Sequence, residues 1–456
     1  MATVEAPNTS ALTSTTPQPG RSWRRSVTSM EVDTRLIGMV LALIAIWVAF
    51  HLLSHGGFLT ARNLWNLSVQ STSIAIMATG MVLIIVSRNI DLSVGSLLGF
   101  LGYTMALVQT DGIVGFFGVD VTVSGLGGKS WVWLVALVLG LALGALAGSV
   151  SGFLVAYVGV PSFIVTLGGF LVWRGAIFRE GGKKGQSLSP LNGTFQRLGG
   201  GGADGSLGEW RSWLLAGLGC VLVVLSLVLS RRRRSRHGLP VRPMWGDVVL
   251  GVVGCAAVLV GVGLIANKYI SPITGDPTGV AYPVVVLVAV TLLMTYLARR
   301  RRFGRYVYAY GGNPEAAELG GINTRRTVMF TFVVMGMLCA VSAAIQTARL
   351  NSAVTNLGVQ NELDVIAAAV IGGTSFAGGI GTVPGAVLGA FIMQSLRSGM
   401  VLLKIDSPSQ DIVVGVVLVT AVAIDSLLRL SRRRMALGAL AVGLLVAAVI
   451  IQTGRT

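Results

Sequence analysis

Residues 69–109 read VQSTSIAIMATGMVLIIVSRNIDLSVGSLLGFLGYTMALVQ, two long apolar runs separated by the polar segment 87–91. An apolar run of about 20 residues can cross the hydrocarbon core of a bilayer as a helix. The polar interruption holds an Arg and an Asp, which a lipid-exposed helix rarely carries. The stretch therefore predicts two membrane helices joined by a break, rather than the core of a soluble domain.

The composition of the whole chain agrees with membrane helices. Of its 456 residues, 53% are hydrophobic and only 12% are charged, and the mean hydropathy is +0.77. Soluble domains carry roughly twice that share of charged residues. These values exclude a soluble globular enzyme, a disordered chain and a small disulfide scaffold. They predict an all-α, polytopic transmembrane helical bundle.

Apolar stretches suited to membrane spans recur along the chain and predict about 12–13 spans, with broken helices and a short cytoplasmic helix. They cover residues 36–53, 69–86, 90–109, 131–155, 161–178, 213–230, 248–266, 283–298, 327–348, 363–372, 383–403, 411–428 and 435–451. The stretch 363–372 is too short to cross alone and is expected to be half of a broken span. The organisation expected is a polar cytoplasmic tail (1–35), a first group of spans (36–178), a Gly-rich extracytoplasmic loop (179–212), inserted spans (213–298), a cytoplasmic loop (299–326), a second group of spans (327–434) and an extra C-terminal span (435–456).

The distribution of basic residues predicts the orientation. With the N-terminus in the cytoplasm and alternating spans, the inside segments hold twice as many Lys and Arg residues as the outside loops. Cytoplasmic loops of membrane proteins carry such an excess. The Arg runs 231–234 and 299–302 are then anchors beside anionic lipid. We expect no nucleic-acid partner, because no folded soluble domain carries these runs.

No reactive or metal-binding centre is evident in the sequence. The cysteines lie in apolar runs, and the histidines lack metal-ligand spacing (Cys220, Cys255, Cys339, His51, His55 and His237). The segment 125–130, GLGGKS, matches the end of a phosphate-binding loop, but the required earlier Gly falls at Val123 and no strand and helix flank it. We expect no catalytic residue, no metal and no cofactor bound by this chain.

Four glycines predict tight helix packing in the span 131–155. Gly140, Gly144, Gly148 and Gly152 recur every four residues and therefore lie on one helical face. Small residues at this spacing let the backbone of a second helix approach closely. The spacing predicts packing and does not identify a function.

Two stretches have the composition of interrupted helices at membrane depth. In the first, 87–96, either Asp91 or Ser93 suits a helix N-terminus, because its side-chain oxygen can accept from free N–H groups. The second, 372–385, is rich in glycine and contains a Pro, and such backbone must be buried in protein or line a watery cavity. The residues predicted for a translocation path at these breaks are Asp91, Ser93, Gly95, Thr166, Gly373, Thr374 and Ser375.

Uncharged polar side chains also occur within the spans, at Gln70, Ser71, Thr72, Ser73, Thr79, Thr166, Gln346 and Gln394. Such donors and acceptors suit a path for a polyhydroxylated solute, and helix–helix hydrogen bonds explain any single one equally well. The charged residues Asp364, Asp425, Arg174 and Arg397 are expected near span ends. With no acid at a span centre, coupling to protons or sodium is disfavoured.

The segment 313–322, NPEAAELGGI, predicts a short exposed helix in the cytoplasmic loop. Asn313 suits the N-cap, Pro314 suits the first helical position, and the Gly pair 320–321 ends the helix. Its small residues would let it sit in a groove of another protein. An ordinary connecting loop explains the same pattern.

Taken together, these stretches resemble the permease subunits of bacterial ABC importers for monosaccharides, the ribose, xylose, arabinose and galactose group. The likeness is carried by residues 78–85 with 90–96, 160–169, 304–322 and 371–389. Within the group, the insertion between about 180 and 300 and the segments 98–102 and 389–393 are most similar to D-xylose permeases. The long N-terminal tail, the Gly-rich stretch 199–205 and the extra C-terminal span depart from the pattern.

The resemblance implies a permease homodimer in the bacterial plasma membrane that passes a monosaccharide, D-xylose being the expected one. ATP hydrolysis would belong to a separate ATP-binding subunit, and an extracytoplasmic sugar-binding protein would dock on the outer loops. The residues implied to couple the chain to the ATP-binding subunit are Asn313, Pro314, Glu315, Ala316, Ala317, Gly321 and Ile322.

Two other classes compete with this reading. An ion-coupled secondary transporter or channel for a small polar solute would act without partner proteins. A membrane-embedded transferase would need an acidic or histidine cluster at one membrane face, and the sequence shows none.

Overall fold

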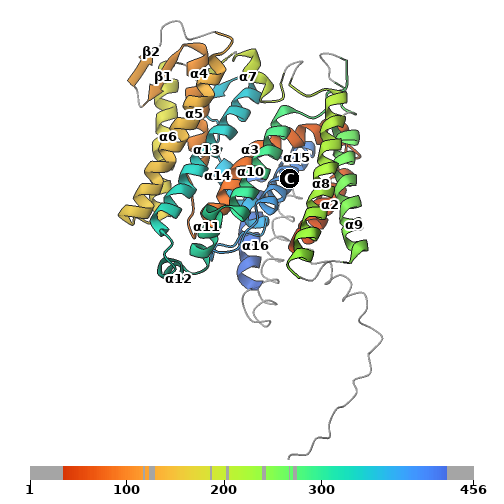
Figure 1. The fold of residues 1–456 in the computed structure, drawn as a ribbon. Coiled ribbons are helices and arrows are strands. Elements are labelled where there is room, and N and C mark those ends of the chain that lie inside the picture. Colours follow the sequence, from red (N-terminus) through yellow and green to blue (C-terminus); the bar gives the residue numbers. More distant parts are fainter. Residues whose placement is uncertain are drawn as a thin grey trace, which may run out of the picture.

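The computed structural model describes residues 34–116, 119–122, 129–184, 187–189, 191–201, 205–238, 243–266, 268–270 and 275–428. This part of the chain is a bundle of helices (Figure 1). The helices are α2 (Thr34–Leu53), α3 (Ala61–Val86), α4 (Val94–Thr110), α5 (Val132–Phe153) with the π-helical turn η1 (Leu154–Val158), α6 (Ser162–Lys184), α7 (Gly193–Arg197), α8 (Glu209–Arg236), α9 (Met244–Val260) with η2 (Gly261–Ala266), α10 (Tyr282–Arg300), α11 (Arg302–Gly312), α12 (Pro314–Leu319), α13 (Thr324–Leu350), α14 (Asn361–Ile371), α15 (Val383–Leu402) and α16 (Ser407–Leu428).

Within the described ranges, nine helices are long and apolar enough to cross a bilayer. The predicted fold class, a polytopic helical bundle with broken helices, is confirmed. Two of the predicted spans are shorter helices, since α4 has 17 residues and α14 has 11. At 1.5 Å per residue, α14 extends about 16 Å, roughly half of a 30 Å hydrocarbon core. The predicted span 435–451 and the tail up to residue 33 lie outside the described residues.

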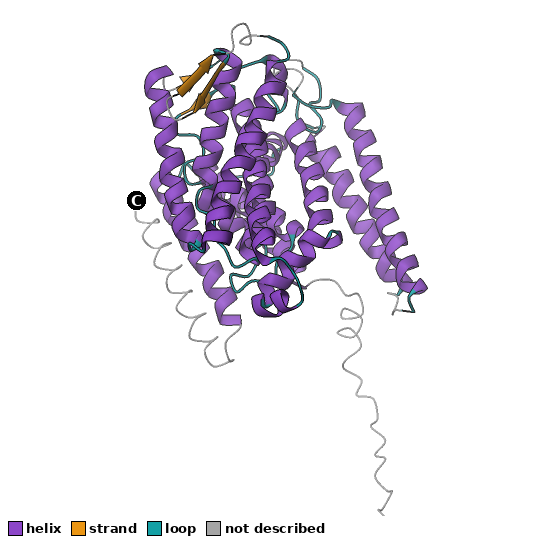
Figure 2. Cartoon of the chain, turned by 60° about the vertical axis from the view of Figure 1, so that its left-hand side comes forward, coloured by secondary structure: helices purple, strands orange, loops and turns teal. Residues whose placement is uncertain are grey.

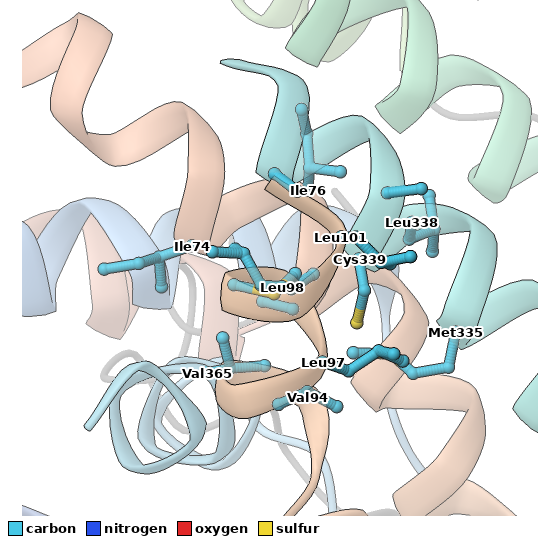
Figure 3. Close-up of a cluster of buried hydrophobic side chains, with 14 of the residues drawn as sticks. Ile74, Ile76, Val94, Leu97, Leu98, Leu101, Met335, Leu338, Cys339 and Val365 are labelled. Atoms are coloured by element: carbon cyan, nitrogen blue, oxygen red, sulfur yellow. The ribbon is translucent and has the colours of Figure 1, made fainter. Parts of the chain in front are cut away.

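The centre of the bundle is α3. In its most apolar window, 94% of the residues are buried within the chain, against 6% in α2. Figure 3 shows side chains from four helices meeting beside it. The labelled residues are Ile74 and Ile76 from α3, Val94, Leu97, Leu98 and Leu101 from α4, Met335, Leu338 and Cys339 from α13, and Val365 from α14. The more exposed helices, such as α2, surround an apolar core to which both broken helices contribute.

The glycine face of α5 packs against α13. A Cβ at Gly144 would run into the carbonyl of Gly336, and one at Gly148 would meet the backbone of Phe332. At Gly152 it would lie 2.8 Å from the carbonyl oxygen of Met329. Gly140 faces Met105 of α4 instead. The four-residue spacing therefore forms a backbone-to-backbone contact, which any larger side chain would separate.

The two ends of the bundle carry different structures. At one end, the two helix breaks meet, since the Gly379 N–H donates to the Val86 carbonyl at 3.0 Å. Gly379 also packs against Gly312 at the end of α11. The helix α12 lies at this lower end in Figure 1. The other end carries short antiparallel ribbons, β1 (Ile113–Phe116) with β2 (Val119–Thr122) and β3 (Ser187–Leu188) with β4 (Ala353–Val354). Figure 2 shows the β1–β2 ribbon beside the helix ends.

The inserted helices α8 and α9 form a hairpin at one side of the bundle (Figure 1). A small apolar cluster formed by Ala216, Val262 and Val280 attaches it near the end that carries the ribbons. Within the hairpin, Arg231 pairs with Asp247 at 2.6 Å. In the Arg run that ends α8, Arg231 is thus paired and Arg234 is half-buried, whereas Arg232 and Arg233 are exposed. An anchor at a membrane surface would present such exposed charges.

Candidate functional site

A polar cavity of about 180 Å³ lies among α3, α13, α14 and α15. Its lining comprises Val69, Gln70, Ser73, Ile74, Ile345, Gln346, Arg349, Val359, Gln360, Asn361, Asp364, Gln394 and Arg397. Four of the uncharged polar residues noted within the spans, Gln70, Ser73, Gln346 and Gln394, therefore converge on one place. We call this space the polar cavity.

Side-chain amides connect the walls of the polar cavity. The Gln394 amide donates to Gln70 Oε1 at 2.9 Å and so links α15 to α3. Gln346 Oε1 accepts from Ser73 Oγ at 3.2 Å and from the Asn361 amide at 3.1 Å. These planar amides retain further donors and acceptors, since each carries two N–H groups and an oxygen with two lone pairs. The cavity wall can exchange internal hydrogen bonds for bonds to a hydroxylated solute.

An ion pair forms another wall of the polar cavity. Arg397 Nη2 donates to Asp364 Oδ1 at 2.9 Å, and Arg397 Nε lies 2.9 Å from Oδ2. The Asp364 side chain is only 4% exposed. Asp364 lies in the first turn of α14 and Arg397 lies near the end of α15, and the start of α14 is buried within the bundle. The pairing neutralises the charge and leaves the cavity polar.

A second charged pair lies on the opposite side of α14. Glu362 is buried, and Arg174 of α6 lies within its electrostatic reach. Arg174 Nη1 also donates to the Thr355 carbonyl at 3.3 Å. Because residues two apart on a helix point in nearly opposite directions, Glu362 and Asp364 face different neighbours. The start of α14 thus pairs with Arg397 of α15 through Asp364, and Glu362 faces the side of α6.

The first helix break is closed by Asp91. Its Oδ1 accepts from the Ser93 N–H at 2.9 Å and from Ser93 Oγ at 2.6 Å. Of the two residues predicted to cap α4, Asp91 accepts the backbone bond, whereas Ser93 makes no capping bond. Thr166 Oγ1 donates to the Ser162 carbonyl at 2.9 Å and reaches the Ile90 carbonyl at 3.3 Å. Gly95 packs against Glu362.

The second helix break, 372–382, borders a separate cavity. This space of about 220 Å³, here named the glycine-loop cavity, is lined by Met39, Tyr308, Gly372, Gly373, Gly379, Ile380, Gly381 and Thr382. Gly373 is therefore the one predicted path residue that lines either of the two cavities. Thr374 and Ser375 are buried beside it, and the Ser375 N–H donates to the Ile380 carbonyl at 2.9 Å. The remaining four predicted path residues lie at the first break and are Asp91, Ser93, Gly95 and Thr166.

The helix predicted within 313–322 is present as α12. Asn313 Oδ1 accepts from the Ala316 N–H at 3.0 Å, Pro314 takes the first position, and Gly321 follows the helix with φ +77°. The side chains of Glu315 and Ala316 are exposed and that of Ile322 is half-buried. The side chain of Ala317, in contrast, is 5% exposed and packs within the chain.

Sequence reasoning missed three features of this end of the molecule. The amphipathic helix α11 precedes α12 directly. Leu319, at the end of α12, is 92% exposed. The sign of this exposure in the sequence is the position of Leu319 in a polar loop, directly before the Gly pair 320–321. Arg88 bonds to the end of α11 through contacts that join residues more than 220 positions apart, and no local pattern reveals them.

The comparison with known families defines the class of protein. Residues 63–422 match the family described as branched-chain amino acid transport system / permease component. The chain belongs to this family of permeases, which are non-catalytic transmembrane subunits of ABC transporters. Membership of this family implies that the chain has an ATPase and a binding protein as partners. No solved structure matches the chain.

The curated proteins that are similar to the chain over most of its length include xylose and ribose permeases. The xylose transport system permease protein XylH of Escherichia coli K12 is 38% identical over 87% of this chain and 92% of its own. The protein of the same name from Haemophilus influenzae is 36% identical over 87% and 97%. The ribose import permease protein RbsC of Escherichia coli K12 is 32% identical over 84% and 92%.

Proposed function

We propose that this chain is the permease of an ATP-driven importer for a monosaccharide, D-xylose. The observation that carries the proposal is the likeness to two xylose permeases over 87% of the chain. The polar cavity supports it, because amides and a neutralised ion pair suit a solute rich in hydroxyl groups. A branched-chain amino acid, the cargo in the family description, would instead favour an apolar pocket for its side chain.

The solute path that we propose runs through the polar cavity and past α14. Asn361 and Asp364 at the start of α14 line the polar cavity, while Gly372 and Gly373 after its end line the glycine-loop cavity. Between them, the buried residues 365–370 separate the two spaces. In this proposal α14 is the barrier, and its displacement opens the path.

The driving force in this proposal enters through α12. A permease without catalytic residues needs a contact with its ATPase, and α12 presents Glu315, Ala316 and Leu319 to solvent. An almost fully exposed Leu on a short capped helix suits an anchor that fills an apolar pocket on a partner. We place this face, and with it the N-terminus, in the cytoplasm of a bacterial plasma membrane, where basic loops concentrate.

The remaining partners follow from the same assignment. Two copies of the chain would form one transporter, and the sugar-binding protein would dock at the end that carries the β1–β2 ribbon and α7. The chain itself would hold no cofactor.

Reconstitution in liposomes tests the proposal. The permease is incorporated with its ATPase and binding protein, and labelled D-xylose, D-ribose and L-leucine are supplied separately. We expect ATP-dependent uptake of xylose, lost when ATP or either partner is omitted and unchanged when ionophores collapse ion gradients. Uptake by the permease alone, driven by an ion gradient, would overturn the proposal in favour of a secondary transporter. Uptake of leucine in place of sugar would overturn the assignment of the cargo.

A further inference from the structure

The end of α11 is held by Arg88 from the first helix break. Arg88 Nε donates to the Gly311 carbonyl at 2.8 Å, and Nη2 donates to the Gly312 carbonyl at 2.9 Å. A guanidinium at a helix C-terminus satisfies free carbonyls and complements the helix dipole. Because Asn313 begins α12 at the next residue, these bonds hold the base of α12.

The loop that follows α14 joins the same place. Its Gly379 N–H donates to the Val86 carbonyl at 3.0 Å. Tyr308 Oη of α11 donates to the Gly381 carbonyl at 2.8 Å. Residues 86–88, 308–312 and 378–381 thus form a three-way junction between the end of α3, the end of α11 and the loop after α14.

Backbone contacts leave little freedom within the three-way junction. A Cβ at Gly379 would lie 2.9 Å from Gly312 Cα, and the φ of Gly379 is +72°, a conformation that other residues rarely adopt. A Cβ at Gly378 would lie 2.6 Å from the Gly311 oxygen. Close-packed groups transmit displacement rather than absorb it. Movement of the end of α11 must therefore move the loop after α14 or break these bonds.

The three-way junction lies between the two parts of the molecule that transport has to connect. On one side is α12, whose exposed face we assign to the ATPase. On the other side, the loop runs back from Gly378 through residues 372–377 to the end of α14 and forward into α15, and the far end of α14 carries Asn361 and Asp364 in the polar cavity. The junction also leads through residues 89–93 into α4.

We infer that Arg88 and Tyr308 are positioning residues that transmit a displacement of α12 to α14. This inference rests on the proposed function, in which α12 docks the ATPase. Arg88 ties α11 to the first break, and Tyr308 ties α11 to the loop after α14. Without the side chains of Arg88 and Tyr308, the ATPase still binds and hydrolyses ATP, but α14 is no longer displaced in each hydrolysis cycle.

The test measures coupling rather than activity alone. Complete transporter of permease, ATPase and binding protein is reconstituted, and D-xylose uptake and ATP hydrolysis are measured in the same vesicles. With Arg88→Ala we expect about a fivefold rise in ATP hydrolysed per sugar transported. Arg88→Lys should restore part of the coupling, since an ammonium lacks the planar fork that reaches both carbonyls. The matched control is Arg305→Ala on the same helix, whose guanidinium donates to the Arg300 carbonyl at 3.1 Å outside the junction.

Tyr308→Phe provides a second variant that removes one hydroxyl only and tests the inference if Arg88→Ala does not insert. We expect the ratio of ATP to sugar to rise with it as well. A merely structural role would lower uptake and hydrolysis in parallel, and an unchanged ratio in these variants would overturn the inference. Failure of the unaltered complex to take up sugar with ATP would overturn the proposed function together with the inference. Coupled uptake with unchanged variants would overturn the inference alone.

Discussion

Replacing Arg397 by Gln removes the cation that neutralises Asp364 inside the bundle. The change should cost about 3–5 kcal/mol of unfolding free energy, because it leaves a carboxylate buried without a partner. Asp364→Asn should cost less, about 1–3 kcal/mol, since Arg397 keeps Asp411 at 3.7 Å and its side chain is 22% exposed. The double variant Asp364→Asn/Arg397→Gln restores a neutral pair and should be more stable than Arg397→Gln alone.

The measurement is a denaturant titration of the purified permease in mixed micelles, followed by fluorescence of its nine Trp residues. Arg62→Gln, which removes an exposed charge at the start of α3, is the control and should change stability by less than about 0.5 kcal/mol. We expect a coupling energy of about 2 kcal/mol or more between Asp364 and Arg397. Simple additivity of the two single changes would refute the description of a buried, mutually dependent pair.

Three further predictions concern packing, docking and the first break. Gly148→Leu should separate α5 from α13 and destabilise the protein by about 1–3 kcal/mol or more, whereas Gly175→Leu, with open space around its α-carbon, should be tolerated in the same titration. Leu319→Glu should reduce binding of the purified ATPase at least about tenfold in a pull-down titration, with insertion unchanged; unaltered affinity would exclude Leu319 as the anchor. Asp91→Ala should lower thermal stability by about 1–3 kcal/mol through loss of its bonds to Ser93, and Asp91→Asn, which keeps an acceptor oxygen, should lose less.

Much of the fold follows from the sequence because the bilayer constrains it. Backbone polar groups must be satisfied within each segment that crosses lipid, so a long apolar run has few alternatives to a helix. The helix α12 was predictable for a different reason, since Asn313 and Pro314 specify its start through local hydrogen bonding and a fixed φ. In both cases the determining interactions lie within a few residues of each other.

The site was less predictable because its contacts join distant segments. Asp364 and Arg397 are 33 positions apart, and the sequence does not reveal that α14 begins inside the bundle. The predicted path residues Asp91, Ser93 and Thr166 make hydrogen bonds at the first helix break. By contrast, Gln70 and Gln394 belong to the polar cavity, and only the packing of α3 against α15 brings them together.

The most direct test of the account concerns the side of the membrane on which α12 lies and what covers it. Leu319→Cys, introduced after the three native cysteines are replaced by Ala, is labelled with a membrane-impermeant maleimide in sealed cells and in inside-out vesicles. We expect labelling only from the cytoplasmic side and protection when the ATPase is bound. Labelling from outside, or an unchanged rate with the ATPase present, would contradict the claim that this permease is driven through α12.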